Sequence, residues 1–374
     1  MKSLLIAATA LILVLTSLPA AAQFRVPRIP GLDKVGDAAD KIGSVVITDQ
    51  EEAEIGAQIS AGLRQQYGVV QDAEVHRYVA LVGNVLAAES TRPSLPWTFI
   101  VLDTPGVNAF AAPGGFIHIT RGALALIGSE AELAGVLAHE ITHVTNKHAL
   151  GEIRKAQGTK IAAAQTRSDA IAMIAEAGFA VVKGNLWGKP DELESDKVGV
   201  ALANKVGYAP TGLGTFLTTL MERNKALADL KEKDRAKVKN GLFSTHPEMQ
   251  ERVTALNKQI SGQKLTASAM VALRYTHYVT YQPVPVPELA AQMAANTPQA
   301  AAPAATVPGQ SFLNRGLDAI SSPTTVLANR QDAGVAYARN VDVEQFAPGG
   351  ADPNPVLVAL TPDDLAEFKR GVQG

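Results

Sequence analysis

Residues 139–143 read His-Glu-Ile-Thr-His, the pattern of a zinc site that carries its own base. On an α-helix each residue turns by about 100°, so His139 and His143 lie one turn apart on the same face. Two neutral imidazoles at this spacing can hold one Zn²⁺ at about 2.0–2.1 Å each. Glu140 lies beside them, where its carboxylate could take a proton from a water that the metal activates. The pattern therefore predicts metal-assisted hydrolysis.

The residues around this pattern predict a buried helix. Ser129, followed three residues later by Glu132, forms a capping box that places the beginning of the helix near residue 130. The helix is mostly apolar, as expected for a domain core, with Leu133, Val136, Leu137, Ile141 and Val144. Burying His and Glu is unfavourable unless they are paired or bind a metal. The context therefore favours a ligand role over a chance match.

A third metal ligand should come from a separate element, because catalytic zinc usually has three protein ligands and one open position. Pro190 suits the first turn of a helix and Gly207 suits its C-terminal cap, which predicts a helix over about 190–206. Glu192 and Asp196 are one turn apart on this helix and could both face the zinc helix. From spacing alone, an acidic first turn that complements the helix dipole is an equally good interpretation.

Two further polar residues are predicted to point away from the metal. His148 lies nine residues after His139, on the opposite face of a continuous helix, so we expect a structural role for it. Glu194 is two residues from both Glu192 and Asp196, and it therefore projects from a different face of its helix. Neither residue belongs to the predicted metal site.

Four motifs in a fixed order resemble the Ste-type zinc endopeptidases. This family includes CAAX prenyl proteases, mitochondrial stress proteases and soluble periplasmic metalloproteases of the BepA type. The resemblance covers about residues 45–260, and its motifs are Val107-Asn-Ala-Phe-Ala-Ala-Pro-Gly-Gly-Phe-Ile-His-Ile-Thr-Arg-Gly, His139-Glu-Ile-Thr-His, Glu192-Leu-Glu-Ser-Asp and Thr245-His-Pro-Glu-Met-Gln-Glu-Arg. The third motif is usually Glu-x-x-Ala-Asp, and Ser195 here replaces an alanine of similar size.

The resemblance implies a role for each matched residue. His139, His143 and Glu192 would bind one Zn²⁺, and Glu140 would be the general base. Asp196 would orient a histidine ligand by accepting the N–H of its other ring nitrogen, as carboxylates usually do for ligating imidazoles.

His246 and Arg252 complete the implied catalytic set. Both would lie over the metal and stabilise the oxyanion that forms during hydrolysis. In some soluble members the histidine of the His-Pro pair instead caps the zinc and holds the enzyme inactive. The resemblance leaves both roles open for His246.

Residues 108–120 are predicted to form a hairpin or an edge strand before the zinc helix. Pro113-Gly-Gly supplies the turn, and the residues after it alternate as in a half-buried strand. In the family such an edge strand pairs with an extended peptide substrate through main-chain hydrogen bonds. The alternative for His118 is an ordinary exposed strand residue. The residues predicted to contact substrate are Asn108, Gly115, Phe116, Ile117 and His118.

The N-terminus has the features of a secretory signal. Lys2 precedes an apolar run from Leu4 to Leu18, which ends in an Ala-x-Ala cleavage site. An uncleaved anchor is the alternative, although the run is short for a membrane span. We predict a periplasmic protein with a signal peptide at 1–22, an N-terminal lead at 23–44, a zinc metallopeptidase domain at 45–262, a connecting segment and Pro/Ala-rich linker at 263–309, and a C-terminal region of unknown role at 310–374.

Composition argues against several other classes of protein. Lys and Arg number 34 against 36 Asp and Glu, and a net charge of −2 does not suit nucleic-acid binding. The chain has no Cys, which excludes disulfides and thiolate ligands. Residues 152–183 are apolar enough to form a lid over the cleft or to make a peripheral membrane contact, although a buried helix is the favoured alternative.

Together these features predict an α+β, mostly helical, gluzincin-type metalloprotease domain with a small hairpin or sheet beside the active-site helix. The expected activity is zinc-dependent hydrolysis of peptide bonds in unfolded or misassembled cell-envelope proteins. One alternative is a chaperone-like protein that binds the same polypeptides while its proteolysis is latent. Another is a structural zinc module, which would need His246 as a permanent fourth ligand. The oligomeric state is left open.

Overall fold

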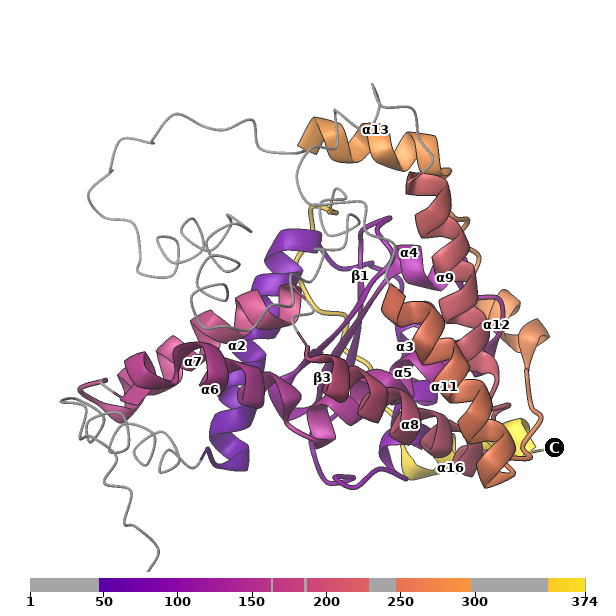
Figure 1. Ribbon diagram of the computed structural model, residues 1–374, viewed down its shortest axis with the longest axis horizontal. Helices are drawn as coiled ribbons and strands as arrows, with labels where there is room; N and C mark the ends of the chain where they lie inside the picture. Colours follow the sequence, from indigo (N-terminus) through magenta and orange to yellow (C-terminus); the bar gives the residue numbers. More distant parts are fainter. Residues whose placement is uncertain (1–46, 163, 185–186, 229–246, 297–348, 374) are drawn as a thin grey trace, which may run out of the picture.

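The computed structural model describes residues 47–162, 164–184, 187–228, 247–296 and 349–373 (Figure 1). The predicted signal peptide, the lead and His246 lie outside the described residues. The helices are α2 (Asp49–Tyr67), α3 (Ala73–Ala87), α4 (Arg121–Leu126), α5 (Glu130–Thr145), α6 (His148–Ala162), α7 (Arg167–Lys183), α8 (Lys189–Val206), α9 (Gly212–Ala228), α11 (Pro247–Gln263), α12 (Ala272–Tyr278), α13 (Val286–Asn296) and α16 (Pro362–Gln373). The strands are β1 (Thr98–Leu102), β2 (Ala109–Ala112) and β3 (Phe116–Thr120), with the 3-10 turn η1 (Pro113–Gly115) between the last two.

The ends of the main helices follow from local sequence. Thr48 accepts a hydrogen bond from the Glu51 amide at the beginning of α2, and the Glu51 carboxylate accepts one from the Thr48 amide in return. Asp72 caps α3, and the Ser129 hydroxyl accepts from the Glu132 amide at the beginning of α5. Helix α5 therefore begins where the sequence predicts, and α2 and α3 begin at capping residues of the same kind.

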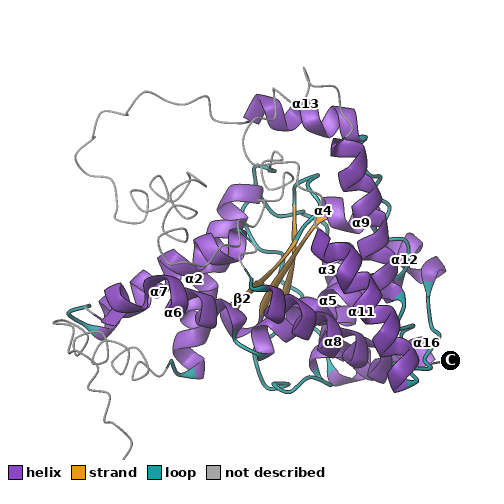
Figure 2. Cartoon of the chain, in the orientation of Figure 1, coloured by secondary structure: helices purple, strands orange, loops and turns teal. Residues whose placement is uncertain are grey.

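A three-stranded sheet lies at the centre of the molecule, covered by helices on both faces (Figure 2). The strand order is β1-β3-β2, with β3 parallel to β1 and antiparallel to β2. Alternate residues enter two separate cores. The core on the side of α3 and α5 receives Phe99, Val101, Ala109, Ala111, Ile117 and Ile119. The core on the side of α2 and α7 receives Ile100, Leu102, Phe110 and Ala112.

The predicted hairpin is confirmed, but for β3 the edge-strand alternative and the half-buried pattern are both wrong. This strand is the central one, and α2 covers the face that was expected to be exposed. His118 is fully buried, and its Nε2 lies 2.9 Å from the Ser60 hydroxyl of α2. Burial lowers the pKa of His118 to about 3. Alternation in sequence records the two faces of a strand and does not reveal that a distant helix covers one of them.

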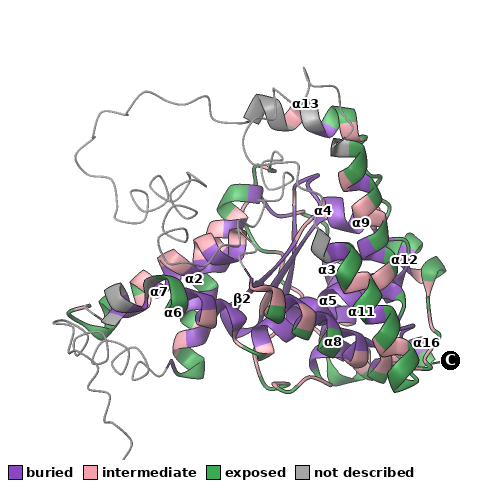
Figure 3. Cartoon of the chain, viewed as in Figure 1, coloured by how far each residue is buried: buried purple, intermediate pink, exposed green. Residues whose placement is uncertain are grey.

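Helix α5 is buried along nearly its whole length (Figure 3). It packs between the sheet and helix α8, with α3 and α9 on its flanks. The mostly apolar sequence of this helix agrees with its place in the core. A polar side chain on α5 that lacks a partner inside the protein therefore destabilises the fold.

Residues 148–162 and 167–183 form the helices α6 and α7, which pack against each other. Helix α7 also packs along α2 and buries its apolar side, which comprises Ala170, Ile174, Ala175, Gly178, Val181 and Val182. This agrees with the buried-helix alternative for the segment. Within the described parts of the chain, every helix is too short or too polar to cross a bilayer.

The described part of the C-terminal region packs onto the helices of the predicted domain at 45–262 instead of forming a unit of its own. The Gly350 amide donates to the carbonyls of Tyr67 and Asp103. Helix α16 then packs on α3 and α8, where Phe368 is buried. The predicted linker also contains the helix α13. The surface that α16 covers is built from residues far away in the chain.

Candidate metal centre

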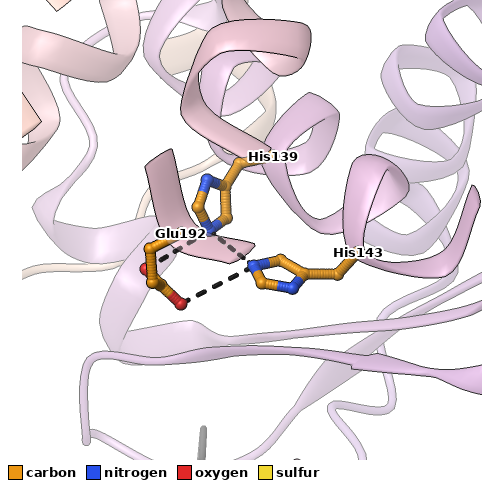
Figure 4. A group of neighbouring side chains, drawn as sticks. All are labelled: His139, His143 and Glu192. Atoms are coloured by element: carbon orange, nitrogen blue, oxygen red, sulfur yellow. Dashed lines mark hydrogen bonds and ion pairs between the residues drawn. The ribbon is translucent and has the colours of Figure 1, made fainter. Parts of the chain in front are cut away.

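Three side chains from two helices converge on one point. His139 and His143 lie one turn apart on α5, and Glu192 lies in the first turn of α8. The Nε2 atoms of His139 and His143 are 3.1 Å apart. Glu192 Oε2 lies 3.8 Å from His139 Nε2, and Glu192 Oε1 lies 3.7 Å from His143 Nε2. Figure 4 shows both rings and the carboxylate pointing into the same space. Within the described ranges, this is the group of His, Asp and Glu side chains close enough to hold one metal ion.

The hydrogen-bond partners of the two imidazoles also suit a cation. His139 Nδ1 lies 2.9 Å from Asp196 Oδ1, which can only accept, so the hydrogen belongs on Nδ1 and the lone pair on Nε2. His143 Nδ1 faces a ring nitrogen of His148 at 3.0 Å. When His143 Nδ1 carries the hydrogen of that ring, two Nε2 lone pairs face each other. Because two tetrahedral ligands of one zinc ion lie about 3.3 Å apart, a Zn²⁺ ion fits between them.

Arg252 on α11 holds the Glu192 and Asp196 carboxylates of α8. Its Nε and Nη2 donate to the two oxygens of Asp196 at 2.7 and 2.8 Å, and its Nη1 lies 2.7 Å from Glu192 Oε2. Burial alone would raise the pKa of Asp196, but the Arg252 charge and the His139 contact outweigh it and hold the pKa well below its usual range. This geometry makes Arg252 an anchor for the carboxylates. Its contact with an oxyanion stays a prediction.

Glu140 has the surroundings of a buried base. Glu140 is 8% exposed, and its Oε2 has no hydrogen-bond partner among the described residues. Burial raises the pKa of Glu140 to about 7, against an opposing effect of the neighbouring His139. A carboxylate with an unpaired oxygen and a pKa near neutrality is suited to accept a proton and return it.

A glycine lets α8 approach α5 closely enough to complete the site. A Cβ atom at Gly199 would lie 2.8 Å from the backbone nitrogen of His139, closer than real Cβ contacts allow. Gly199 lies two turns after Glu192 on the same helix, so this close contact fixes which face of α8 meets α5. Pro190 and Gly207 stand at the ends of α8 as the sequence predicts.

The prediction that His148 lies on the opposite face of the zinc helix is wrong. Helix α5 ends at Thr145, Lys147 adopts a left-handed conformation with φ 56°, and a new helix begins at His148. The His148 ring therefore turns back onto His143. Glu194, also predicted to point elsewhere, lies 3.3 Å from His148 Nε2. Helical phase predicts a face only while the helix continues.

Trp187 is a neighbour of the site that the sequence did not reveal. Its ring lies 4.7 Å from the His143 ring, measured between centroids, and the residue is buried. Its position one residue before the N-cap of α8 is the one local signal that could have suggested it.

The residues predicted to bind substrate divide between an edge and the centre of the sheet. Asn108 directly precedes β2, which pairs with β3 alone among the described strands. Gly115 ends the turn, while Phe116, Ile117 and His118 lie on β3, whose two edges are both occupied. Of the two strands near the predicted substrate-binding residues, β3 is central and β2 has one edge that pairs with no described strand.

Comparisons with known proteins agree with this geometry. The model of peptidase family M48 matches residues 72–260, which is just over half of the chain and includes all three converging side chains. A putative beta-barrel assembly-enhancing protease of Vibrio cholerae serotype O1 is 29% identical over 250 residues, covering 63% of this chain and 48% of the relative.

Two other relatives show the breadth of the similarity. The beta-barrel assembly-enhancing protease of Escherichia coli (strain K12) is 27% identical over 205 residues, 51% of this chain and 42% of the relative. The mitochondrial metalloendopeptidase OMA1 of Schizosaccharomyces pombe is 28% identical over 193 residues, 48% of this chain and 52% of the relative. The chain thus spans about half the length of the curated relatives it matches. By the extent of the family match, the chain belongs to peptidase family M48.

Proposed function

We propose that this protein is a zinc-dependent endopeptidase that cleaves unfolded or misassembled polypeptides of the cell envelope. The observation that carries the proposal is the buried, unpaired carboxylate oxygen of Glu140 beside the cluster of His139, His143 and Glu192. Membership of a peptidase family supports the activity. The names of the bacterial relatives support a role in the assembly or quality control of β-barrel proteins.

The chain's own residues supply the proton transfer and the rigid frame. When bound, zinc would polarise the scissile carbonyl and activate water. Glu140 takes a proton from the attacking water and delivers it to the leaving amine. Asp196 holds the His139 ring, and Arg252 holds Asp196, so the ligands keep their orientation as charge develops. His246 directly precedes α11 and is the candidate for stabilising the oxyanion or for capping the metal.

The edge strand β2 supports an extended peptide as substrate. It packs beside α5, the helix that carries the proposed base. A peptide that pairs with β2 through main-chain hydrogen bonds would lie along this helix and need no particular sequence. Such recognition requires an unfolded segment, because a folded protein does not offer a free strand. The predicted secretory signal supports the periplasm as the compartment of these encounters.

The test compares the zinc-loaded full chain with its Glu140→Gln variant on an unfolded casein-like substrate. Wild type should cleave, and Glu140→Gln should bind zinc equally well and cleave at least about 100-fold more slowly, the usual contribution of a general base. Normal cleavage by Glu140→Gln would overturn the mechanism. If neither protein cleaves while both suppress aggregation of the substrate, the chaperone-like alternative replaces this proposal.

A further inference from the structure

His148 lies against one of the proposed metal ligands, although the predicted site does not include it. Its Nδ1 is 3.0 Å from His143 Nδ1, and the two rings are nearly perpendicular, with an angle of 80° between their planes. On the other side of the ring, Nε2 lies 3.3 Å from Glu194 Oε2. His148 is buried, with 7% of its surface exposed. The ring therefore stands between the ligand and a carboxylate.

A second cluster of contacts fixes the turn that brings His148 to this place. Lys147 has φ 56°, and its Nζ lies 2.8 Å from the carboxylate of Glu52 on α2. The same carboxylate accepts a hydrogen bond from the Gly114 amide, in the turn between β2 and β3, at 3.1 Å. Glu52 is 1% exposed. The break between α5 and α6 is thus anchored from two other elements.

The positions of the hydrogens on the three groups are mutually consistent. If His143 presents its Nε2 lone pair to a metal, its Nδ1 carries a hydrogen and needs an acceptor. The Nδ1 lone pair of His148 lies within reach. His148 then carries its own hydrogen on Nε2, where Glu194 can accept it. The Ser195 hydroxyl, 3.4 Å from His148 Nδ1, can donate to the same lone pair.

We propose that His148 is a positioning residue of the metal centre, which accepts a hydrogen bond from His143 Nδ1 and so fixes the ring that binds the metal. The inference rests on the proposed function in one respect, since it assumes that His143 binds the metal through Nε2. It gives His143 the support that Asp196 gives His139. Outer hydrogen-bond partners of this kind change metal affinity by about 10–100-fold when they are removed.

The first test measures zinc affinity by competition with a chromophoric chelator, which does not depend on proteolysis. His148→Leu keeps the bulk and removes the acceptor, and it should weaken zinc binding by about 10–100-fold. His148→Asn places an amide oxygen near the former Nδ1 and should restore most of the affinity. His277→Leu, the same change at an exposed position of α12, is the matched control and should bind as wild type does. His148→Leu with wild-type affinity would overturn the proposal.

The second test needs no variant and therefore holds even if His148→Leu does not fold. Nitrogen chemical shifts of the histidine rings in the zinc-loaded full chain should show the hydrogen of His143 on Nδ1 and that of His148 on Nε2. A residue that only fills space has no reason to hold this tautomer. A His148 hydrogen on Nδ1 would overturn the proposal.

The two proposals fail in different ways. A wild-type chain that binds zinc and shows the expected tautomers but cleaves nothing would overturn the proposed function alone. A chain that binds no zinc would overturn both. Cleavage by wild type with unchanged zinc affinity in His148→Leu would overturn the positioning role alone.

Discussion

Glu130 and Glu140 lie on the same buried helix, and their surroundings are opposite. Glu130, at the N-terminal end of α5, is fully buried and every one of its oxygens is paired. The hydroxyls of Tyr78 and Tyr208 each donate to it at 2.7 Å, and Arg274 donates from Nε at 2.7 Å and also from Nη2. Burial and the adjacent carboxylate raise the pKa of both tyrosines, which keeps them protonated as donors.

Glu140 is nearly as buried as Glu130, but it accepts fewer hydrogen bonds. Its Oε2 has no partner among the described residues, and burial raises its pKa to about 7. Burial of a carboxylate therefore does not distinguish a structural residue from a catalytic one. The distinction lies in whether the neighbours satisfy its oxygens, because an unpaired buried carboxylate destabilises the fold and is retained where it does chemistry.

The largest expected effect is on catalysis at Glu140. Replacing it with Gln removes the base, and kcat/KM on a fluorogenic unfolded peptide should fall by about 10²–10⁴-fold. The melting temperature of the metal-free chain should stay the same or rise, since no strong partner is lost. A large fall in melting temperature, measured by calorimetry, would contradict the view that this carboxylate is unsatisfied.

The same substitution at Glu130 should lower the stability of the protein and leave catalysis unchanged. Glu130→Gln leaves the Arg274 charge uncompensated, and the free energy of unfolding should fall by about 2–4 kcal/mol, somewhat below the usual value for a fully buried pair because Arg274 is 23% exposed. Denaturant titration measures this loss. Zinc affinity and kcat/KM of the folded fraction should be unchanged, and a loss of either would mean that the two ends of α5 are coupled.

Removing one donor from Glu130 should have a smaller effect. Tyr208→Phe deletes one hydrogen bond to a carboxylate that keeps its other partners, and the expected loss of stability is about 1.5–2 kcal/mol. Tyr281→Phe provides a matched control, because the Tyr281 hydroxyl has no hydrogen-bond partner among the described residues. Equal effects of the two changes would show that ring packing, and not the hydrogen bond, carries the contribution.

The smallest effect concerns a third buried glutamate, Glu52, and it depends on pH. Burial alone would raise its pKa, but Arg92, Lys147 and the Gly114 amide outweigh burial and lower the pKa below its ordinary value of 4.5. The stabilisation is therefore present above that value and is lost as pH falls through the lowered pKa. Glu52→Gln should be about 1 kcal/mol less stable than wild type at pH 7, and the difference should vanish in acid. A difference independent of pH would mean that the charge of Glu52 is not involved.

Local sequence predicted most of the elements that form the site. The capping residues Thr48, Asp72 and Ser129 set the beginnings of three helices, and Pro190 and Gly207 delimit a fourth. The spacing of His139 and His143 needs only one turn of helix. These features can be predicted from the sequence because each depends on residues within one or two turns of each other.

Other features were decided only by the tertiary structure. The turn at Lys147 returns His148 to His143, and it depends on Glu52, almost a hundred residues earlier. His118 is buried because α2 covers its side of the sheet, and β3 is central because β1 pairs with it from the other side. Periodicity describes one element at a time, whereas burial, hydrogen-bond partners and pKa arise from elements that are distant in sequence. The sequence alone determined which residues could do chemistry. The packing of α3, α8 and α9 around α5, together with Arg252 of α11 on the carboxylates of α8, decided which of these residues are paired and which keep an unpaired oxygen.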